Sequence, residues 1–412
     1  MHALGSGSLF VALFFSLAAC GDDSAPQGGS GGAAQPLGGG GAGEGAGGNA
    51  SGAGGSGGAP QGGGGAGEGG SGGQAAAWTT PTCTSVSGTG AITITTDEGA
   101  TLMPNAGGLQ NVTYTAGIVA LEEANTLLAA SGGNLLRSVD AGCSWTDIGD
   151  LPEPIMFLEL GAGDVVYGWY DNADSLVRIE GDAITTLEAP GAGLHGLGVD
   201  PADGLHLRVV DDAGQIHDSD DAGFSFAPIG VPAENGGLFY AADFDPENLD
   251  HVLVGLSNTG VRHTENGGAS WATSTGVGAV GNANAFAVTF ASADSSVVYL
   301  QGFDLGTAIG EEVRRIWRSA DGGGSFQAVV AESPEVTLTN GVLLVPHPTD
   351  SDVLYFEFGT YFQGYGTDIY RYDHATGNVT TTHNSYDDVS SIAFNPADAS
   401  VMYFGLTAAA PN

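Results

Sequence analysis

An eight-residue pattern recurs along this chain and constrains its fold more than any other feature. The pattern is Ser/Thr-x-Asp/Asn-x-Gly-x-Ser/Thr-aromatic, and it occurs at residues 138–145, 219–226, 264–271 and 319–326. Residues 95–102 keep every polar position and replace only the aromatic residue. In a hairpin turn, Asp or Asn bonds to its own backbone, Gly adopts a positive φ, and a hydroxyl group fixes the loop. Each copy therefore predicts a tight turn between two β-strands.

A second repeated element combines Pro with Asp or Asn, at residues 199–203, 244–248, 347–350 and 394–398. Each copy separates two apolar runs and predicts the turn between the first and second strands of a repeated unit. From Trp78 onward, such runs alternate with Gly, Asp, Asn and Pro about every eight to twelve residues, which is typical of all-β folds. No stretch shows helical periodicity of useful length.

The eight-residue pattern resembles the Asp-box of BNR-repeat β-propellers, the superfamily of sialidase-like and sortilin-like proteins. Its third position falls at residues 97, 140, 221, 266 and 321. Positions 140 and 221 lie about two repeats apart, so a degenerate turn is expected near residues 180–182, and another near 371–377. The sequence thus predicts an all-β, seven-bladed β-propeller with Asp-box turns over residues 77–412.

The closure of this ring follows from the two ends of the repeat array. The last unit supplies only two strands, at residues 389–394 and 401–406, and the first eight-residue turn has too little sequence before it for a whole blade. N-terminal strands are therefore expected to complete the C-terminal blade, which leaves the ring without exposed edges.

The polar and aromatic residues of the turns are expected to be structural rather than catalytic. The polar residues shape the turn, and the aromatic residue begins the next strand and packs between neighbouring sheets. The residues assigned to this role are Asp97, Asp140, Asp221, Asn266, Asp321, Trp145, Phe226, Trp271 and Phe326.

The N-terminal residues read as an export signal. An apolar run over residues 9–17 leads into Leu17-Ala18-Ala19-Cys20, which resembles the bacterial lipobox, although the residues before the run include His2 and no Lys or Arg. The resemblance implies a signal peptide at 1–19, lipidation of Cys20 and a place in the bacterial cell envelope, at the outer membrane or cell surface. The alternatives are a secretory signal cut elsewhere or a short membrane helix.

Residues 20–76 are dominated by Gly with Ala, Ser and Gln. Because Gly loses the most conformational entropy on ordering and nothing here can form a core, a disordered tether is expected. Random-coil scaling gives it a span on the order of 40 Å.

The charge balance restricts the partners. Asp and Glu number 47 against eight Arg, with no Lys, for a net charge of −39. Nucleic acid and anionic lipid surfaces are therefore disfavoured, so membrane contact is expected only through the lipid. The excess of acidic residues predicts either a solvated surface that keeps a monomer soluble or carboxylates that bind divalent cations. No cofactor and no metal site can be assigned, although calcium stays open.

Two cysteines remain once Cys20 is assigned to a lipid. Cys83 and Cys143 lie in a compartment that permits disulfides. They either form a disulfide or stay as two unpaired small apolar residues, and only the distance between their Cβ atoms decides.

The resemblance places ligands on the face opposite the Asp-box turns, in the loops between second and third strands and in those that join one blade to the next. These loops mix aromatic rings with carboxylates, a combination suited to a sugar or a peptide, although the same residues also suit a covering of the blades. The candidate residues are Trp169, Tyr170, Asp171, Asp174, Asp304, Glu311, Glu312, Tyr361, Phe362, Tyr365 and Asp368.

No catalytic residue can be assigned from the sequence. The family's sialidases use three Arg, one in an Arg-Ile-Pro signature that this chain lacks, and Arg137, Arg262, Arg318 and Arg371 precede or enter turns. We therefore expect a non-catalytic binding or scaffolding module for a glycan or an envelope protein. The alternative is a glycoside hydrolase, sialidase-like or endo-glucanase-like, which requires two close carboxylates on the ligand face, at least one with a raised pKa.

Overall fold

The computed structural model describes residues 77–84, 93–102, 104, 109, 115–170, 174–233, 238–278, 282–308, 310–360, 365–385 and 388–407. All of them belong to one compact unit, residues 71–412. The expected signal peptide (1–19), Cys20 and the expected tether (20–76) lie outside the described residues.

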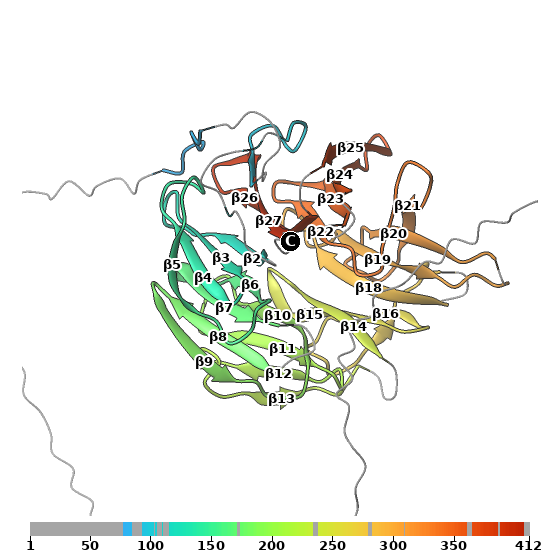
Figure 1. The fold of residues 1–412 in the computed structure, drawn as a ribbon. Coiled ribbons are helices and arrows are strands. Elements are labelled where there is room, and N and C mark those ends of the chain that lie inside the picture. Colours follow the sequence, from blue (N-terminus) through green and yellow to red (C-terminus); the bar gives the residue numbers. More distant parts are fainter. Residues whose placement is uncertain are drawn as a thin grey trace, which may run out of the picture. The chain divides into compact units, whose positions relative to one another are not determined.

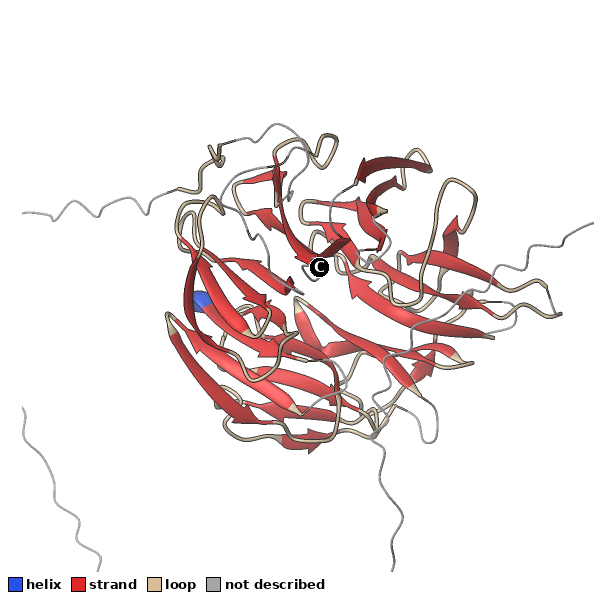
Figure 2. Cartoon of the chain, viewed as in Figure 1, coloured by secondary structure: helices blue, strands red, loops and turns tan. Residues whose placement is uncertain are grey.

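Seven antiparallel sheets are arranged around an axis in the order of the chain (Figure 1). The described part of the chain consists of strands and loops, with one short helical turn, η1 (Ala162–Asp164), as Figure 2 shows. Blade 1 consists of β2 (Thr115–Ala120), β3 (Leu127–Ser131), β4 (Asn134–Ser138) and β5 (Thr146–Asp150), and blade 2 of β6 (Phe157–Leu160), β7 (Val165–Trp169), β8 (Ser175–Glu180) and β9 (Ala183–Glu188). Blade 3 consists of β10 (Leu194–Val199), β11 (Leu207–Asp211), β12 (Ile216–Ser219) and β13 (Ala227–Ile229), and blade 4 of β14 (Phe239–Asp245), β15 (Asn248–Leu256), β16 (Gly260–Thr264) and β17 (Ala272–Thr273). Blade 5 consists of β18 (Ala283–Phe290), β19 (Val298–Asp304), β20 (Val313–Ser319) and β21 (Gln327–Ala331), and blade 6 of β22 (Leu344–His347), β23 (Asp350–Thr360), β24 (Gly366–Asp373) and β25 (Asn378–Asn384).

Blade 7 confirms the predicted closure of the ring. It consists of β26 (Asp388–Asn395), β27 (Asp398–Thr407) and β1 (Ile94–Thr95), and β1 pairs with β27 through Ile94 opposite Tyr403. A strand from the start of the folded unit therefore completes the last blade. The prediction of an all-β, seven-bladed propeller is confirmed. The two expected degenerate turns are the hairpins β8–β9 of blade 2 and β24–β25 of blade 6.

Two faces of the ring are distinguished by their loops. The lower face carries the turns between first and second strands and between third and fourth strands. The upper face carries the loops between second and third strands and the connections between blades. The first strands of the blades line the inside of the ring, where neighbouring ones contact each other, such as β2 with β6 and β14 with β18.

The core lies between adjacent sheets, and the turn residues pack into it. Phe326 is 4% exposed and joins a cluster with Leu253, Val298 and Trp317. Gly323 packs so closely on the preceding blade that a Cβ would lie 2.3 Å from a methyl carbon of Leu253. The Gly of the pattern is therefore required by close packing as well as by its positive φ of 91°.

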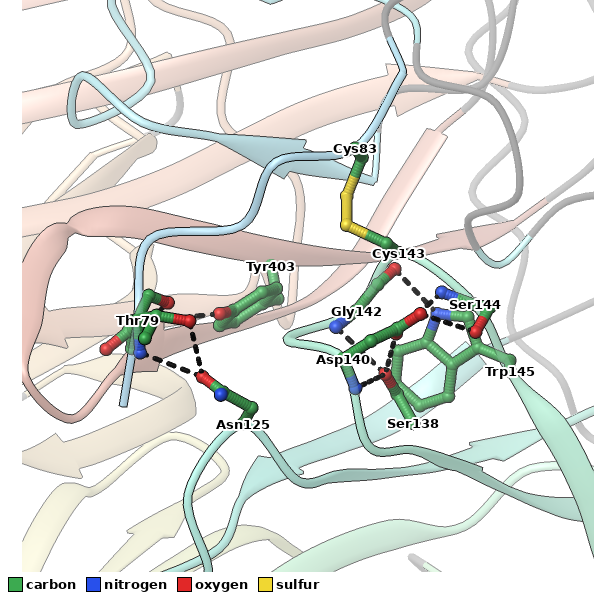
Figure 3. Close-up of a disulfide and its surroundings, with 11 residues drawn as sticks. Thr79, Cys83, Asn125, Ser138, Asp140, Gly142, Cys143, Ser144, Trp145 and Tyr403 are labelled. Carbon is green, nitrogen blue, oxygen red and sulfur yellow. Dashed lines mark hydrogen bonds between the residues drawn. A yellow bond between two sulfur atoms is a disulfide. The ribbon is translucent and has the colours of Figure 1, made fainter. Parts of the chain in front are cut away.

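The N-terminal segment is also attached to blade 1 (Figure 3). Cys83 and Cys143 form a disulfide, one of the two alternatives left open by the sequence, with Cα atoms 5.1 Å apart. The Thr79 backbone N–H donates to Asn125 Oδ1 at 2.8 Å. Because β1 of the same segment belongs to blade 7, the segment joins the last blade to the first.

Candidate functional site

The five eight-residue turns share one hydrogen-bonding arrangement on the lower face. Asp140 Oδ1 accepts from the Ser138 hydroxyl (2.9 Å) and the Ser144 backbone N–H (2.8 Å), and Oδ2 accepts from the Ser144 hydroxyl at 2.6 Å (Figure 3). Burial opposes the ionisation of Asp140, but these hydrogen bonds outweigh it and lower its pKa. Equivalent bonds surround Asp97, Asp221, Asn266 and Asp321.

A further backbone hydrogen bond joins the two lower turns of a blade. In blade 1 the Ala141 N–H donates to the Asn125 carbonyl at 2.9 Å, and in blade 3 the Ala222 N–H donates to the Leu205 carbonyl at 2.8 Å. The same bond links Gly267 to Asp250, Gly322 to Ser296, His374 to Asp352 and Glu98 to Ser400. The lower face is therefore a fixed framework in which the turn carboxylates already have partners.

The arginines are distributed around the ring instead of converging. Four of them link neighbouring blades, and the other four bond within a blade or to the connection before or after it. The blade-to-blade pairs are Arg137–Asp182, Arg208–Asp250, Arg318–Asp352 and Arg371–Glu98. The remaining pairs are Arg178–Glu180, Arg314–Glu332, Arg315–Asp304 and Arg262 with the Ala233 carbonyl.

Two predicted ligand residues, Tyr365 and Asp368, meet on the upper face of blade 6. The Tyr365 hydroxyl donates to Asp368 Oδ2 at 2.7 Å, and this bond raises the pKa of Tyr365 to about 12. His383 Nδ1 lies 2.8 Å from Asp368 Oδ1. The Tyr365 ring packs edge-on against His383 and Phe358, with centroids 5.2 and 5.6 Å away, and remains 43% exposed. This group offers an accessible aromatic ring beside a carboxylate and an imidazole.

The other predicted ligand residues mostly bond within their own loops. Glu311 accepts from the backbone N–H groups of Thr307 and Ala308 and from the Thr307 hydroxyl, and Glu312 accepts from the Gly310 N–H. Asp304 accepts from the Gly306 N–H, and Asp174 from the Gly193 N–H.

Two aromatic members of the predicted ligand face, Trp169 and Tyr170, lie at blade 2. The Trp169 ring packs at a tilt of 43° against Phe157, with centroids 5.1 Å apart, and Tyr170 follows it in a half-buried position. Asp171, Tyr361 and Phe362 lie outside the described residues. The predicted face is therefore not one continuous group of side chains within the described part of the chain.

The sequence missed a pair of carboxylates inside the ring. Glu159 on β6 and Asp243 on β14 lie two blades apart and interact electrostatically. The Glu159 side chain keeps contact with solvent, but desolvation by the surrounding strands and the charge of Asp243 raise its pKa to about 8. Burial also raises the pKa of Asp243 to about 7, against hydrogen bonds from the backbone N–H groups of Phe290 (2.8 Å) and Phe244 (3.0 Å). The available signal was an acidic residue inside an apolar first strand.

A second such pair lies between blades 6 and 7. Glu357 on β23 and Asp388 on β26 interact, and burial and their mutual repulsion raise the pKa of Glu357 well above its usual value. The Thr367 hydroxyl donates to Asp388 at 3.0 Å, yet burial still raises the pKa of Asp388. Both pairs thus retain protons at pH values where an isolated carboxyl in water has lost its proton.

Within the described residues, no group of three or more His, Cys, Asp or Glu is arranged to hold a metal ion. The same part of the chain contains no helix with the length and apolar character needed to cross a membrane.

Comparison with known proteins identifies one curated relative of high similarity. The chain is 47% identical over 337 residues to the dispase autolysis-inducing protein of Streptomyces mobaraensis, a match that covers 80% of this chain and 90% of the relative. No family model matches the sequence.

Solved structures share the fold at low identity. A GH74 xyloglucanase from Xanthomonas campestris has a TM-score of 0.52 at 17% identity, covering 72% of this chain and 51% of the xyloglucanase. The Cps50 (Swd1) β-propeller domain of Myceliophteria thermophila has a TM-score of 0.50 at 9% identity, covering 72% of this chain and 99% of that domain. At these identities the likeness concerns the propeller fold alone.

Proposed function

The chain belongs to the family of the dispase autolysis-inducing protein, and we propose that it is a non-catalytic module that binds a protease and promotes the self-cleavage of that protease. Autolysis is the cleavage of a protease by itself, so a protein that induces it needs no active site of its own. The observation that carries the proposal is the similarity to this relative along nearly all of the relative's length.

A rigid ring can act in this way by binding one conformation of the protease more tightly than another. A binding partner shifts a conformational equilibrium only by its difference in affinity for the two states. If the favoured state exposes a cleavable segment, a second protease molecule cuts it sooner. The lower face suits such a role, because backbone hydrogen bonds between its turns hold this face in one arrangement.

The proposal is tested by following intact dispase over time with increasing amounts of the full-length chain. We expect the rate of loss of intact dispase to rise and then saturate as the chain binds all of the protease. An unrelated acidic protein serves as the control. An unchanged rate at every concentration would refute the proposal.

The alternative of a glycoside hydrolase is favoured by one observation, the carboxylates with raised pKa at Glu159 and Asp243. An acid and nucleophile pair needs its two pKa values pushed apart, so that one group is protonated while the other is ionised. Here desolvation raises both, and backbone N–H groups already bind both oxygens of Asp243. If the wild type hydrolysed aryl glycosides and Glu159→Gln did not, the hydrolase would replace the binding module as the better-supported function.

A glycan or an envelope protein remains a second candidate ligand, and the exposed ring of Tyr365 beside Asp368 and His383 supports it, since aromatic rings stack on sugars. A glycan array with the wild type and with Tyr365→Ala tests this candidate. Binding that persists in the variant excludes the Tyr365 group as the site.

Attachment to the bacterial cell envelope through Cys20 is part of the proposed function and rests on the lipobox-like residues 17–20. The test is incorporation of labelled fatty acid in a bacterial host. We expect labelling of the wild type and none of Cys20→Ala, and labelling of both would contradict the proposal.

A further inference from the structure

Two large apolar side chains are exposed on neighbouring turns of the lower face of blade 3. Leu205, in the turn between the first and second strands, is 47% exposed, and Phe224, in the eight-residue turn, is 63% exposed. The Ala222 N–H donates to the Leu205 carbonyl at 2.8 Å, which holds the two turns together. Two exposed apolar side chains on turns that are bonded together are a starting point for an interaction surface when a second feature adjoins them.

The fold does not require apolar residues at these positions. The residues whose carbonyls accept the equivalent bond in five other blades are all polar, and the residues equivalent to Phe224 in the other eight-residue turns are small. The former are Asn125, Asp250, Ser296, Asp352 and Ser400, and the latter are Ala100, Cys143, Ala269 and Gly324. Blade 3 therefore carries two apolar residues where the repeat supplies polar or small ones.

An acidic depression of about 170 Å³ lies beside this apolar pair, between the lower turns of blades 3 and 4. His206, the residue after Leu205, lines it, together with the carboxylates of Asp200, Glu247 and Asp250 and the guanidinium of Arg208. Arg208 is already bonded to Asp250 at 2.6 Å and to the Leu249 carbonyl at 2.8 Å. His206 is likewise 3.2 Å from Asp200, so Glu247 is the lining carboxylate that these two side chains leave for a ligand.

We propose that Leu205, Phe224 and this acidic depression form the surface on which the protease docks, through a segment that presents an apolar side chain next to Lys or Arg. The apolar side chain covers Leu205 and Phe224, and the cation enters the depression. This inference rests on the proposed function, because the occupant is the protease. A second copy of the chain does not fit, since its net charge of −39 places like charges against the depression.

The test is the affinity of the full-length chain for catalytically inactivated dispase, so that self-cleavage does not consume the partner. We expect the double variant Leu205→Ser with Phe224→Ser to lose about tenfold or more in affinity, since a few central apolar residues carry most binding energy. Val139→Ser is the matched control, because Val139 lies in the equivalent turn of blade 1, is 67% exposed and lies away from the depression. Circular dichroism of each variant confirms that the fold is kept.

The charged half of the surface has its own measurement. Glu247→Gln is expected to weaken binding several-fold at low salt and to reduce the loss of affinity that added salt causes in the wild type.

Four outcomes decide the matter. Loss of affinity in the double variant with an unaffected Val139→Ser supports the docking surface. Equal affinity in all variants overturns the surface while the proposed function stands. Equal loss in the double variant and in Val139→Ser also overturns it, because the effect is then not specific to blade 3. Absence of binding by the wild type overturns both the surface and the proposed function.

Discussion

The lower turns and the first strands of the ring use the same acidic residue type in opposite ways. In the turn of blade 5, hydrogen bonds from Ser325 and Ser319 lower the pKa of Asp321, so the carboxylate stays ionised. Inside the ring, burial raises the pKa of Asp243 to about 7. The difference teaches that local hydrogen-bond donors close in sequence favour the charged form, whereas the neighbouring blades desolvate the inner groups and favour the neutral form.

The opposite shifts have opposite consequences for stability. An acid with a lowered pKa contributes stability that is present above its usual pKa and is lost as the pH falls through the lowered value. An acid with a raised pKa contributes stability at low pH that is lost as the pH rises from its usual pKa to the raised one. The fold is therefore expected to be weakened by the turns in acid and by the inner carboxylates toward pH 8.

The largest expected effect on stability comes from the disulfide that attaches the N-terminal segment to the lower turn of blade 1, whereas the other lower turns are held by hydrogen bonds. Replacing Cys83 and Cys143 by Ser removes a cross-link between residues 60 positions apart, which is expected to lower the free energy of unfolding by about 4 kcal/mol. Denaturant unfolding with and without reductant measures it. Reductant should weaken the wild type and leave the double variant unchanged, and equal stability of the two proteins would show that hydrogen bonds alone hold this junction.

A smaller effect is expected from the turn carboxylate itself. Asp321→Ala removes the acceptor for Ser319 and Ser325 and is expected to destabilise the fold by about 1 to 2 kcal/mol. Asp321→Asn is the matched control, because Asn266 holds the same turn in blade 4, where its Oδ1 accepts two of these bonds and its Nδ2 donates to the Ser270 hydroxyl. Thermal unfolding at pH 7 should place the Asn variant near the wild type, and equal loss in both variants would mean that charge, not the turn geometry, matters.

The contribution of the inner carboxylates to stability is expected to depend on pH in the opposite direction to that of the turn carboxylates. The wild type is expected to lose about 1 to 2 kcal/mol of stability between pH 5 and pH 8 as Glu159 and Asp243 release protons. Glu159→Gln should flatten this decline, which denaturant unfolding across the pH range detects. A decline of the same size in Glu159→Gln would show that its carboxyl is not responsible.

The smallest effect concerns the upper face of blade 6. Asp368→Asn is expected to return the pKa of Tyr365 from about 12 toward its ordinary value, with a stability change of about 1 kcal/mol or less. The difference in ultraviolet absorbance between the variant and the wild type at alkaline pH reports the titration. Tyr365→Phe in the Asp368→Asn background should abolish that difference, and an unaltered titration would contradict the assigned bond.

The sequence predicted the features that repeat and missed those that do not. The turns around Asp140 and Asp321 were predictable because their donors lie within four residues along the chain. The strand pairing that closes blade 7 was predictable by counting strands. Glu159 and Asp243 are 84 residues apart and meet only because blades 2 and 4 curve around one axis. Likewise, the apolar pair of Leu205 and Phe224 stands out only when equivalent turns are superposed.

The central claim, that the chain induces self-cleavage without cleaving anything itself, is tested most directly by the intact mass of catalytically inactivated dispase after incubation with the full-length chain. The account predicts an unchanged mass under conditions in which the same amount of chain speeds the fragmentation of active dispase. Fragments released from the inactivated protease would contradict it and would show that the chain carries a hydrolytic site of its own.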